Sequence, residues 1–272
     1  YGHTIGNRLG REAAINAGLI LDPDAPIAVH HCPPHSFQPI PGKVNVLWAA
    51  WEFPELIPIE TEGLKRADML FTTARFLVEL FEHESGVPTF YIPQGIRTEL
   101  FTEAKRRKPH RNERFRYLWV GAPNDRKGWR HIFAAWKWMQ HDPSIELYVK
   151  TTFQYESMPD GRYGNIIVDT ANRSDDEMRD LYHSAHCFLF PSMGEGFGFT
   201  LGEAMSTGLP SIFTPATALA DLADSSCGYP LGKLRVALAQ IYVTSFALFM
   251  SVVIYGVVVA LVRPGGSAQI EG

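Results

Sequence analysis

Short apolar runs alternate with segments of helical periodicity along most of the chain. The runs are rich in β-branched and aromatic residues and predict strands at 26–30, 44–49, 69–73, 90–92, 115–120, 145–150, 166–169, 187–190 and 211–213. The amphipathic segments predict helices at 5–17, 75–84, 130–140, 175–183 and 201–207. Alternation of apolar strands with helices is typical of parallel sheets that are covered on both faces. The pattern therefore predicts the α/β class.

The predicted helix at 175–183 carries a strong start signal. Ser174 is a favourable N-cap residue, and Asp175, Asp176 and Glu177 place negative charge at the positive end of the helix dipole. We therefore expect this helix to begin directly after Ser174.

A basic stretch, KRRKPHR at 105–111, separates two series of strands and helices. Such a polar, charged stretch is typical of a solvated linker between domains, and a contact with phosphates is the alternative. The sequence thus predicts an N-terminal α/β domain at 1–104 and a second α/β domain at 112–232, followed by a tail at 233–263.

Composition narrows the classes of protein and of partner. Of the 272 residues, 46% are hydrophobic and 20% are charged, which excludes intrinsic disorder. The net charge of −4 argues against a nucleic-acid partner. Cys32, Cys187 and Cys227 show no paired spacing, which excludes a disulfide scaffold and a zinc ribbon and favours a reducing compartment. Because the start shows no secretory leader, we expect a cytoplasmic protein, and because it begins at Tyr1 without Met, we expect a fragment.

The tail contains 27 uncharged residues, from Val236 to Val262. About 20 apolar residues are enough to cross a bilayer, so we expect a transmembrane helix that anchors the protein to the cytoplasmic face of a membrane. A foreign or out-of-frame tail and a buried core helix are the two alternatives.

The segment with the strongest chemical signal, PSMGEGFGFTLGEAM, follows the predicted strand at 187–190 and leads into a helix. Gly194, Gly196 and Gly198 permit tight turns and the close approach of a ligand to the backbone. The amides of residues 197–200 belong to a helix N-terminus, which suits a phosphate or a developing anion. Ligands of open α/β sheets bind at such strand ends.

Charged residues accompany this turn. Glu195 and Glu203 are eight positions apart, which is unsuited to a close acid–base pair but suits the two ends of one extended ligand. Arg126 and Lys127 follow the predicted strand at 115–120 and can neutralise a diphosphate at the same edge of the sheet. Ordinary surface bases are the alternative for this pair.

The E-x7-E pattern of Glu195 and Glu203 within EGFGFTLGEAMSTGLPSIF resembles the donor-site signature of glycosyltransferase family 4. The segment WVGAPNDRKGWRHIFAAW is similar to the loop that carries the phosphate-binding lysine of that family, here Lys127. The similarity covers roughly residues 1 to 230. It implies the GT-B fold, with two Rossmann-like domains facing across a cleft, both incomplete here. The apolar C-terminal helix predicted above is added to this fold and departs from the family pattern.

The resemblance also implies a role for each matching residue. Glu203 would bind the nucleotide ribose and Glu195 the hydroxyls of the donor sugar, while Lys127, with Arg126 as the weaker candidate, would stabilise the departing diphosphate. The remaining donor-binding candidates belong to the glycine-rich turn and the helix start: Gly196, Phe197, Gly198, Phe199 and Thr200. The family needs no metal. One departure is Ala122, which stands where the family often has Arg.

Candidates on the acceptor side are His30 and Glu52, which lie at or after the ends of predicted strands in the N-terminal domain. For His30 the alternative is a structural or exposed histidine, and for Glu52 it is packing in the core or at the rim of the domain. His183 and His186 have the spacing of a metal pair but no third ligand, so the sequence predicts no metal site and no cofactor.

The resemblance therefore implies a retaining, metal-independent glycosyltransferase that moves a sugar from a UDP- or GDP-linked donor to an acceptor hydroxyl. A glycan, a lipid-linked and a protein acceptor all stay open. A non-catalytic, membrane-anchored nucleotide-sugar-binding or scaffold subunit is the main alternative. A nucleotide-sugar epimerase, which shares the two-domain architecture, is a further one.

Overall fold

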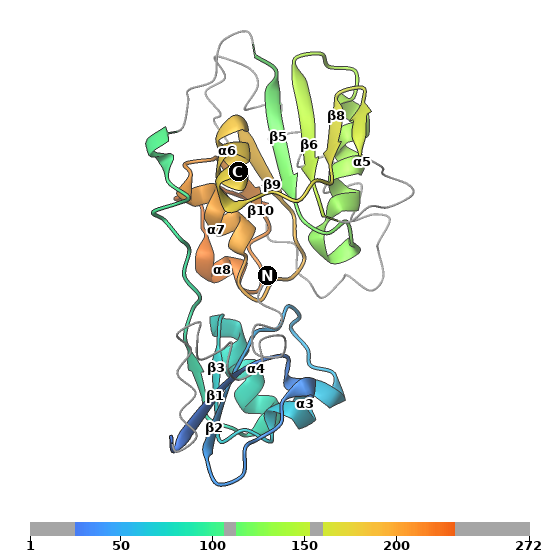
Figure 1. The fold of residues 1–272 in the computed structure, drawn as a ribbon. Helices are drawn as coiled ribbons and strands as arrows, with labels where there is room; N and C mark the ends of the chain where they lie inside the picture. Colours follow the sequence, from blue (N-terminus) through green and yellow to red (C-terminus); the bar gives the residue numbers. More distant parts are fainter. Residues whose placement is uncertain (1–24, 106–112, 153–159, 232–272) are drawn as a thin grey trace. The chain divides into compact units, whose positions relative to one another are not determined.

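The computed structural model describes residues 25–105, 113–152 and 160–231 (Figure 1). The chain divides into two compact units, residues 1–94 and 95–272. Each unit contains its own sheet.

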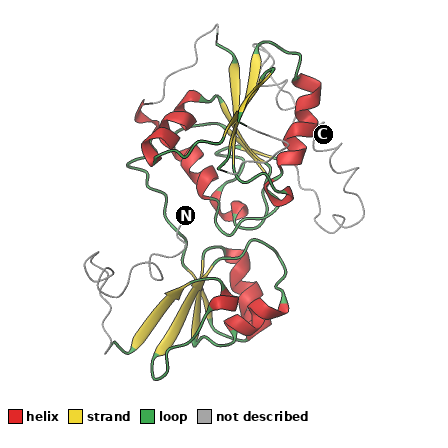
Figure 2. Cartoon of the chain, turned by 45° about the vertical axis from the view of Figure 1, so that its right-hand side comes forward, coloured by secondary structure: helices red, strands yellow, loops and turns green. Residues whose placement is uncertain are grey.

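The first unit is built on a four-stranded parallel sheet in the order β1-β2-β3-β4. Its strands are β1 (Ile27–His31), β2 (Val44–Ala49), β3 (Met69–Thr72) and β4 (Thr89–Tyr91). Its helices are α3 (Pro58–Leu64) and α4 (Arg75–Ser85), and a 3-10 turn spans Pro34–Ser36. Because consecutive parallel strands are neighbours and their crossovers share one hand, the helices lie on one face of the sheet (Figure 2).

The second unit is built on a seven-stranded sheet in the order β11-β10-β9-β5-β6-β8-β7, in which β7 alone of the described strands runs antiparallel to its neighbour. Its strands are β5 (Phe115–Val120), β6 (Ile145–Lys150), β7 (Gly161–Tyr163), β8 (Ile166–Asp169), β9 (Cys187–Phe190), β10 (Ser211–Phe213) and β11 (Tyr229–Pro230). The strand order reverses between β5 and β9, which is the switch point of a doubly wound sheet.

Helices cover both faces of this second sheet (Figure 1). The helices are α5 (Trp129–Met139), α6 (Asp175–Ser184), α7 (Phe199–Ser206) and α8 (Leu219–Leu222). Tyr117 and Trp119 of β5 pack with α5, while Leu118 and Val120 pack in a second core with α6 and α7. This alternation explains why β5 is apolar throughout its carboxyl half, as expected for a strand buried on both faces.

The described structure confirms the α/β class, and the predicted strands agree with the observed ones to within one residue at each end. The helix predicted after Ser174 is also confirmed. The hydroxyl of Ser174 accepts a hydrogen bond from the backbone N–H of Glu177, and the carboxylate of Glu177 accepts one from the N–H of Ser174. The helix expected at 201–207 begins earlier, at Phe199. The pattern missed α3, α8, β7 and β11, which are too short to show a period.

Several other expectations concern the ends and the middle of the chain. The helix at 5–17, the apolar run from Val236 to Val262 and most of the predicted linker lie outside the described residues. Within the described ranges, no helix has the length and hydropathy needed to cross a bilayer. The two units divide after Gln94 instead of near residue 104, because Phe101 is buried in a core of the second unit.

Candidate functional site

Two loops of the second unit meet at the carboxyl ends of the neighbouring parallel strands β5 and β9. The N–H of Met193 donates to the carbonyl of Arg126, with 2.7 Å between nitrogen and oxygen. Gly128 adopts a left-handed conformation with φ of 69°, and a Cβ there would lie 2.1 Å from the carbonyl oxygen of Pro191. The predicted placement of both loops at one edge therefore agrees with the structure, and a glycine is what allows their backbones to touch.

Glu195 is the centre of this junction and is only 6% exposed. Its Oε1 lies 2.7 Å from Nζ of Lys127 and accepts a hydrogen bond of 2.6 Å from the hydroxyl of Ser192. Its Oε2 lies 3.4 Å from Nη1 of Arg126, which also donates to the carbonyl of Gly194 at 2.6 Å. The structure thus brings together Glu195, Lys127 and Arg126, and it adds a buried serine that the sequence did not single out.

The backbone of Glu195 is held from a third loop, between β10 and α8. The N–H of Glu195 donates to Oγ1 of Thr217 at 2.9 Å, and the N–H of Ala218 donates to the carbonyl of Glu195 at 3.3 Å. Thr217 has φ of 53° and is, among the described residues, the one non-glycine with a positive φ. Sequence analysis missed Thr217, because neither its φ nor its contact with a residue 22 positions away leaves a periodic signal.

The glycine-rich turn continues from Glu195 into α7. Gly198 has φ of 103°, and a Cβ on it would lie 2.6 Å from Cδ2 of Leu219. Phe199 and Thr200 form the first turn of α7, where backbone amides have no partner within the helix. The ring of Phe197 contacts that of Phe199 edge to face at 4.9 Å between centroids. Amides and a dipole at such a helix N-terminus are suited to binding an anion.

Glu203 lies in α7 and has partners different from those of Glu195. Its Oε2 accepts a hydrogen bond of 2.9 Å from the hydroxyl of Tyr182. Burial raises the pKa of the Glu203 carboxyl, and the Tyr182 hydroxyl partly opposes this shift. The nearby Arg97 is paired with Asp175 at 2.5 Å. The carboxylates of Glu195 and Glu203 thus contact different side chains: Glu203 contacts Tyr182, whereas Glu195 contacts Lys127 and Ser192.

The two acceptor-side candidates of the first unit are His30 and Glu52. Nε2 of His30 is 3.0 Å from Oδ1 of Asn45, and its ring contacts that of Phe37 at 4.8 Å between centroids. Glu52 is half-buried in the loop that follows β2. Neither observation assigns a ligand to these residues.

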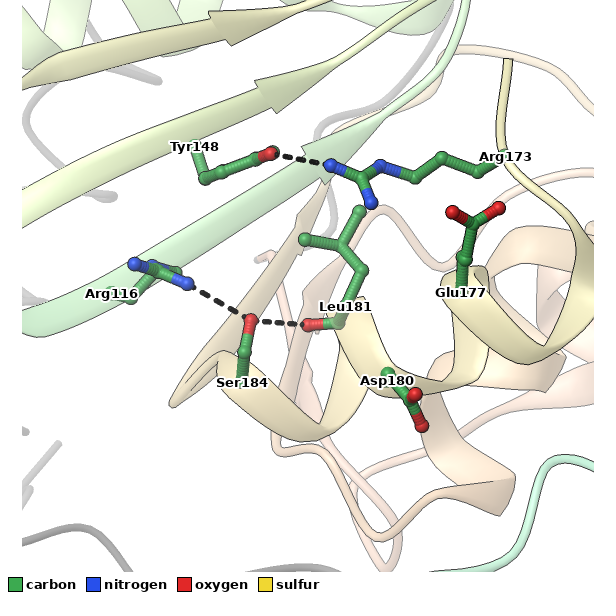
Figure 3. Close-up of a pocket in the computed structure, with 7 residues that line it drawn as sticks. All are labelled: Arg116, Tyr148, Arg173, Glu177, Asp180, Leu181 and Ser184. Atoms are coloured by element: carbon green, nitrogen blue, oxygen red, sulfur yellow. Dashed lines mark hydrogen bonds between the residues drawn. The ribbon is translucent and has the colours of Figure 1, made fainter. Parts of the chain in front are cut away.

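A pocket of about 340 Å³ opens elsewhere on the second unit, between α6 and the strands β5 and β6 (Figure 3). Arg173 donates to the hydroxyl of Tyr148 there, and Arg116 donates to the hydroxyl of Ser184. The guanidinium groups are also paired with the carboxylates of Asp169 and Glu146. None of the predicted site residues lines this pocket. In the part of the chain that the structure describes, no three His, Cys, Asp or Glu side chains are grouped to hold a metal ion.

Comparisons with known proteins point to one class. Residues 114–240, a little under half of the chain, match the family model described as "Glycosyl transferases group 1". No curated protein matches the sequence at a significant level.

Solved structures give the fold. The pneumococcal O-GlcNAc transferase GtfA in complex with UDP and GlcNAc has a TM-score of 0.56 at 15% identity, over 81% of this chain and 46% of that one. TarM has a TM-score of 0.59 at 10% identity, over 86% of this chain and 49% of that one. The E. coli trehalose-6-phosphate structure bound with UDP-2-fluoro glucose has a TM-score of 0.54 at 10% identity, over 80% of this chain and 64% of that one.

The chain spans less than two thirds of the length of each of these three proteins. At these identities the likeness concerns the fold alone, and it confirms the GT-B fold. The family match covers the whole junction around Glu195 and supports the resemblance to glycosyltransferases.

Proposed function

We propose that this chain belongs to an enzyme that transfers a sugar from a nucleotide-diphosphate sugar to an acceptor hydroxyl, with retention of anomeric configuration. The observation that carries the proposal is the junction of Glu195 with Lys127 and Arg126, at the start of a glycine-rich turn that ends in a helix N-terminus. The match of residues 114–240 to a glycosyltransferase family supports it. UDP-linked donors are the first to test, because two similar structures hold UDP or a UDP-sugar analogue.

In this proposal, the first-turn amides of α7 bind the diphosphate together with Lys127 and Arg126. The two bases stabilise the negative charge that grows on the diphosphate as its bond to the sugar breaks. Positive side chains and a helix dipole supply the neutralisation that a metal ion provides in other sites, so we propose that the reaction is metal-independent. Glu203 binds the ribose at the other end of the donor.

The contacts of Glu195 bear on whether the enzyme itself bonds to the sugar. Its carboxylate contacts an ammonium, a guanidinium and a hydroxyl, so its charge is engaged and it is a poor nucleophile. We therefore propose that no covalent sugar–enzyme intermediate forms. The bond between the anomeric carbon and the diphosphate oxygen breaks, the acceptor oxygen bonds to the same face of that carbon, and the acceptor proton passes to the departing diphosphate. Glu195 meanwhile holds hydroxyls of the donor sugar.

The test measures UDP release from UDP-glucose and UDP-N-acetylglucosamine and, by calorimetry, binding of these donors and of their GDP counterparts. Lys127→Gln removes one of the charges that face the diphosphate, and a loss of about 10²-fold or more in rate is expected, as for other oxyanion-stabilising groups. Arg130→Gln is the matched control, since Arg130 lies three positions after Lys127 in the first turn of α5 but is exposed and paired with Asp125. The control should keep the wild-type rate.

Each outcome decides something. Donor binding without release or transfer by the wild-type chain would favour a nucleotide-sugar-binding subunit over an enzyme. No binding of any of these donors by the folded chain would overturn the proposed function. An inverted anomer in the product, read from the coupling of the anomeric proton by NMR, would overturn retention alone.

A further inference from the structure

Thr217 combines two features that rarely occur together in one residue. Its backbone is left-handed, with φ of 53°, although it carries a branched Cβ. Its hydroxyl accepts the N–H of Glu195 at 2.9 Å and donates to the carbonyl of Ala216 at 2.8 Å. For a β-branched residue this conformation is strained, and such strain persists only where the surroundings impose it.

The backbone conformation of Thr217 and the hydrogen bond of its hydroxyl favour different residue types. A left-handed position is best filled by glycine, as at Gly128 and Gly198 in the neighbouring loops. Glycine cannot accept the N–H of Glu195. Threonine at this position therefore has a conformational cost, but its hydroxyl can accept the hydrogen bond that glycine cannot.

The loop between β10 and α8 also holds the other side of the turn. The N–H of Ala218 donates to the carbonyl of Glu195, so residues 217 and 218 bind both polar groups of the Glu195 backbone. Two residues further along, Leu219 lies against Gly198 at the opposite end of the turn. The side chain of Glu195 is held separately by Lys127, Arg126 and Ser192.

We propose that Thr217 is a positioning residue for the donor site, whose hydroxyl fixes the backbone of Glu195 so that its carboxylate meets the donor sugar. This inference rests on the proposed function of Glu195. It assigns to Thr217 an effect on the sugar part of the donor and none on the nucleotide, because the nucleotide is bound by α7, Lys127 and Glu203.

The test compares three substitutions in the full chain, with calorimetric affinities for UDP and for UDP-glucose and UDP-N-acetylglucosamine. Thr217→Ser keeps the hydroxyl, Thr217→Val keeps the branched Cβ, and Thr217→Gly removes both. The hydroxyl hypothesis predicts that the serine variant binds UDP-sugars like the wild type. The glycine and valine variants should lose about tenfold in affinity for the UDP-sugar, the loss expected for one hydrogen bond, with UDP affinity unchanged.

Thermal unfolding separates this role from a purely structural one. Thr217→Gly relieves the left-handed strain but loses the hydrogen bonds of the hydroxyl, whereas Thr217→Val loses the same bonds and keeps the strain. The glycine variant should therefore have the higher Tm of the two, while both lose affinity for UDP-sugars. A glycine variant with wild-type affinity for UDP-sugars would overturn the proposal, and so would equal losses for UDP and UDP-sugar. A wild-type chain that binds neither UDP-linked nor GDP-linked sugars would instead refute the proposed function on which the inference rests.

Discussion

Substitution of Gly128 by alanine tests whether the contact between the two loops of the site is required. The glycine has φ of 69°, and an added Cβ would lie 2.1 Å from the carbonyl oxygen of Pro191 and 2.9 Å from its carbonyl carbon. An ordinary van der Waals contact begins near 3.4 Å, so one loop must move by more than 1 Å. Because both atoms belong to the backbone of Pro191, no side-chain rotation can relieve the clash.

The cost has two parts. The left-handed conformation costs an alanine about 1–2 kcal/mol. Forcing the loops apart adds about 1–3 kcal/mol, the usual range for an overpacked position. Gly164 provides a matched control in the same unit, since its φ is 62° and nothing lies within 4 Å of its added Cβ. Gly164→Ala should therefore show the first part alone.

The assay is differential scanning calorimetry of both variants, with UDP-sugar binding measured on the same samples. With about 2–4 °C per kcal/mol for a chain of this size, the extra 1–3 kcal/mol should lower the Tm of Gly128→Ala by about 2–12 °C more than that of Gly164→Ala. It should also weaken donor binding, because Lys127 precedes Gly128 and moves with it. Equal Tm values for the two variants would refute the tight contact between the loops.

Three further predictions follow from single contacts. Ser192→Ala removes the hydroxyl that lies 2.6 Å from the buried Glu195, so the free energy of unfolding measured in urea should fall by about 2 kcal/mol; an unchanged value would mean that solvent replaces the bond. Glu203→Gln should raise stability at pH 7, because burial raises the pKa of that carboxyl in the folded state and the charged form is therefore penalised. The folded state holds this proton more tightly than the unfolded state, in which the pKa of the carboxyl is about 4.3. In a pH series of Tm, the gain of the glutamine variant should therefore appear as the pH rises above that value and vanish below it. A gain that persists at pH 3 would contradict a raised pKa of Glu203. Tyr117→Phe removes a buried hydroxyl without a hydrogen-bond partner among the described residues, so it should raise the free energy of unfolding by about 1 kcal/mol, whereas a loss would reveal a partner.

The elements of the fold were predictable because their signals are local. Strands such as β5 and β9 are short, apolar and bounded by polar turns, and α6 starts at a capping box that can be read from four consecutive residues. Helix α3 was not predictable in the same way. It begins with Pro58 and contains Gly63, whose missing Cβ leaves room for the carbonyl of Pro34, a residue distant in sequence.

The candidate site likewise combines features that are predictable from local sequence with features that depend on tertiary contacts. That the loops after β5 and β9 lie at one edge follows from sequence, since parallel strands of one sheet have their carboxyl ends on one side. The motif around Glu195 and Lys127 was visible as a resemblance. The partners of Glu195 were not, because the sequence does not reveal that β5 and β9 are immediate neighbours, nor that the loop after β10 reaches back over the turn.

Local sequence patterns are sufficient to predict the α/β class, the strand positions, the capped start of α6 and the residue types that suit an anion. These features depend on periodicity, caps and short motifs, which act between residues close in the chain. Two features require the folded chain: the convergence of Lys127, Arg126 and Ser192 on one buried carboxylate, and the hydrogen bond that the backbone N–H of Glu195 donates to a strained Thr217. The contacts of Glu195 with Thr217, Lys127 and Arg126 span 22, 68 and 69 positions, and they depend on strand order and close packing, which no local pattern encodes.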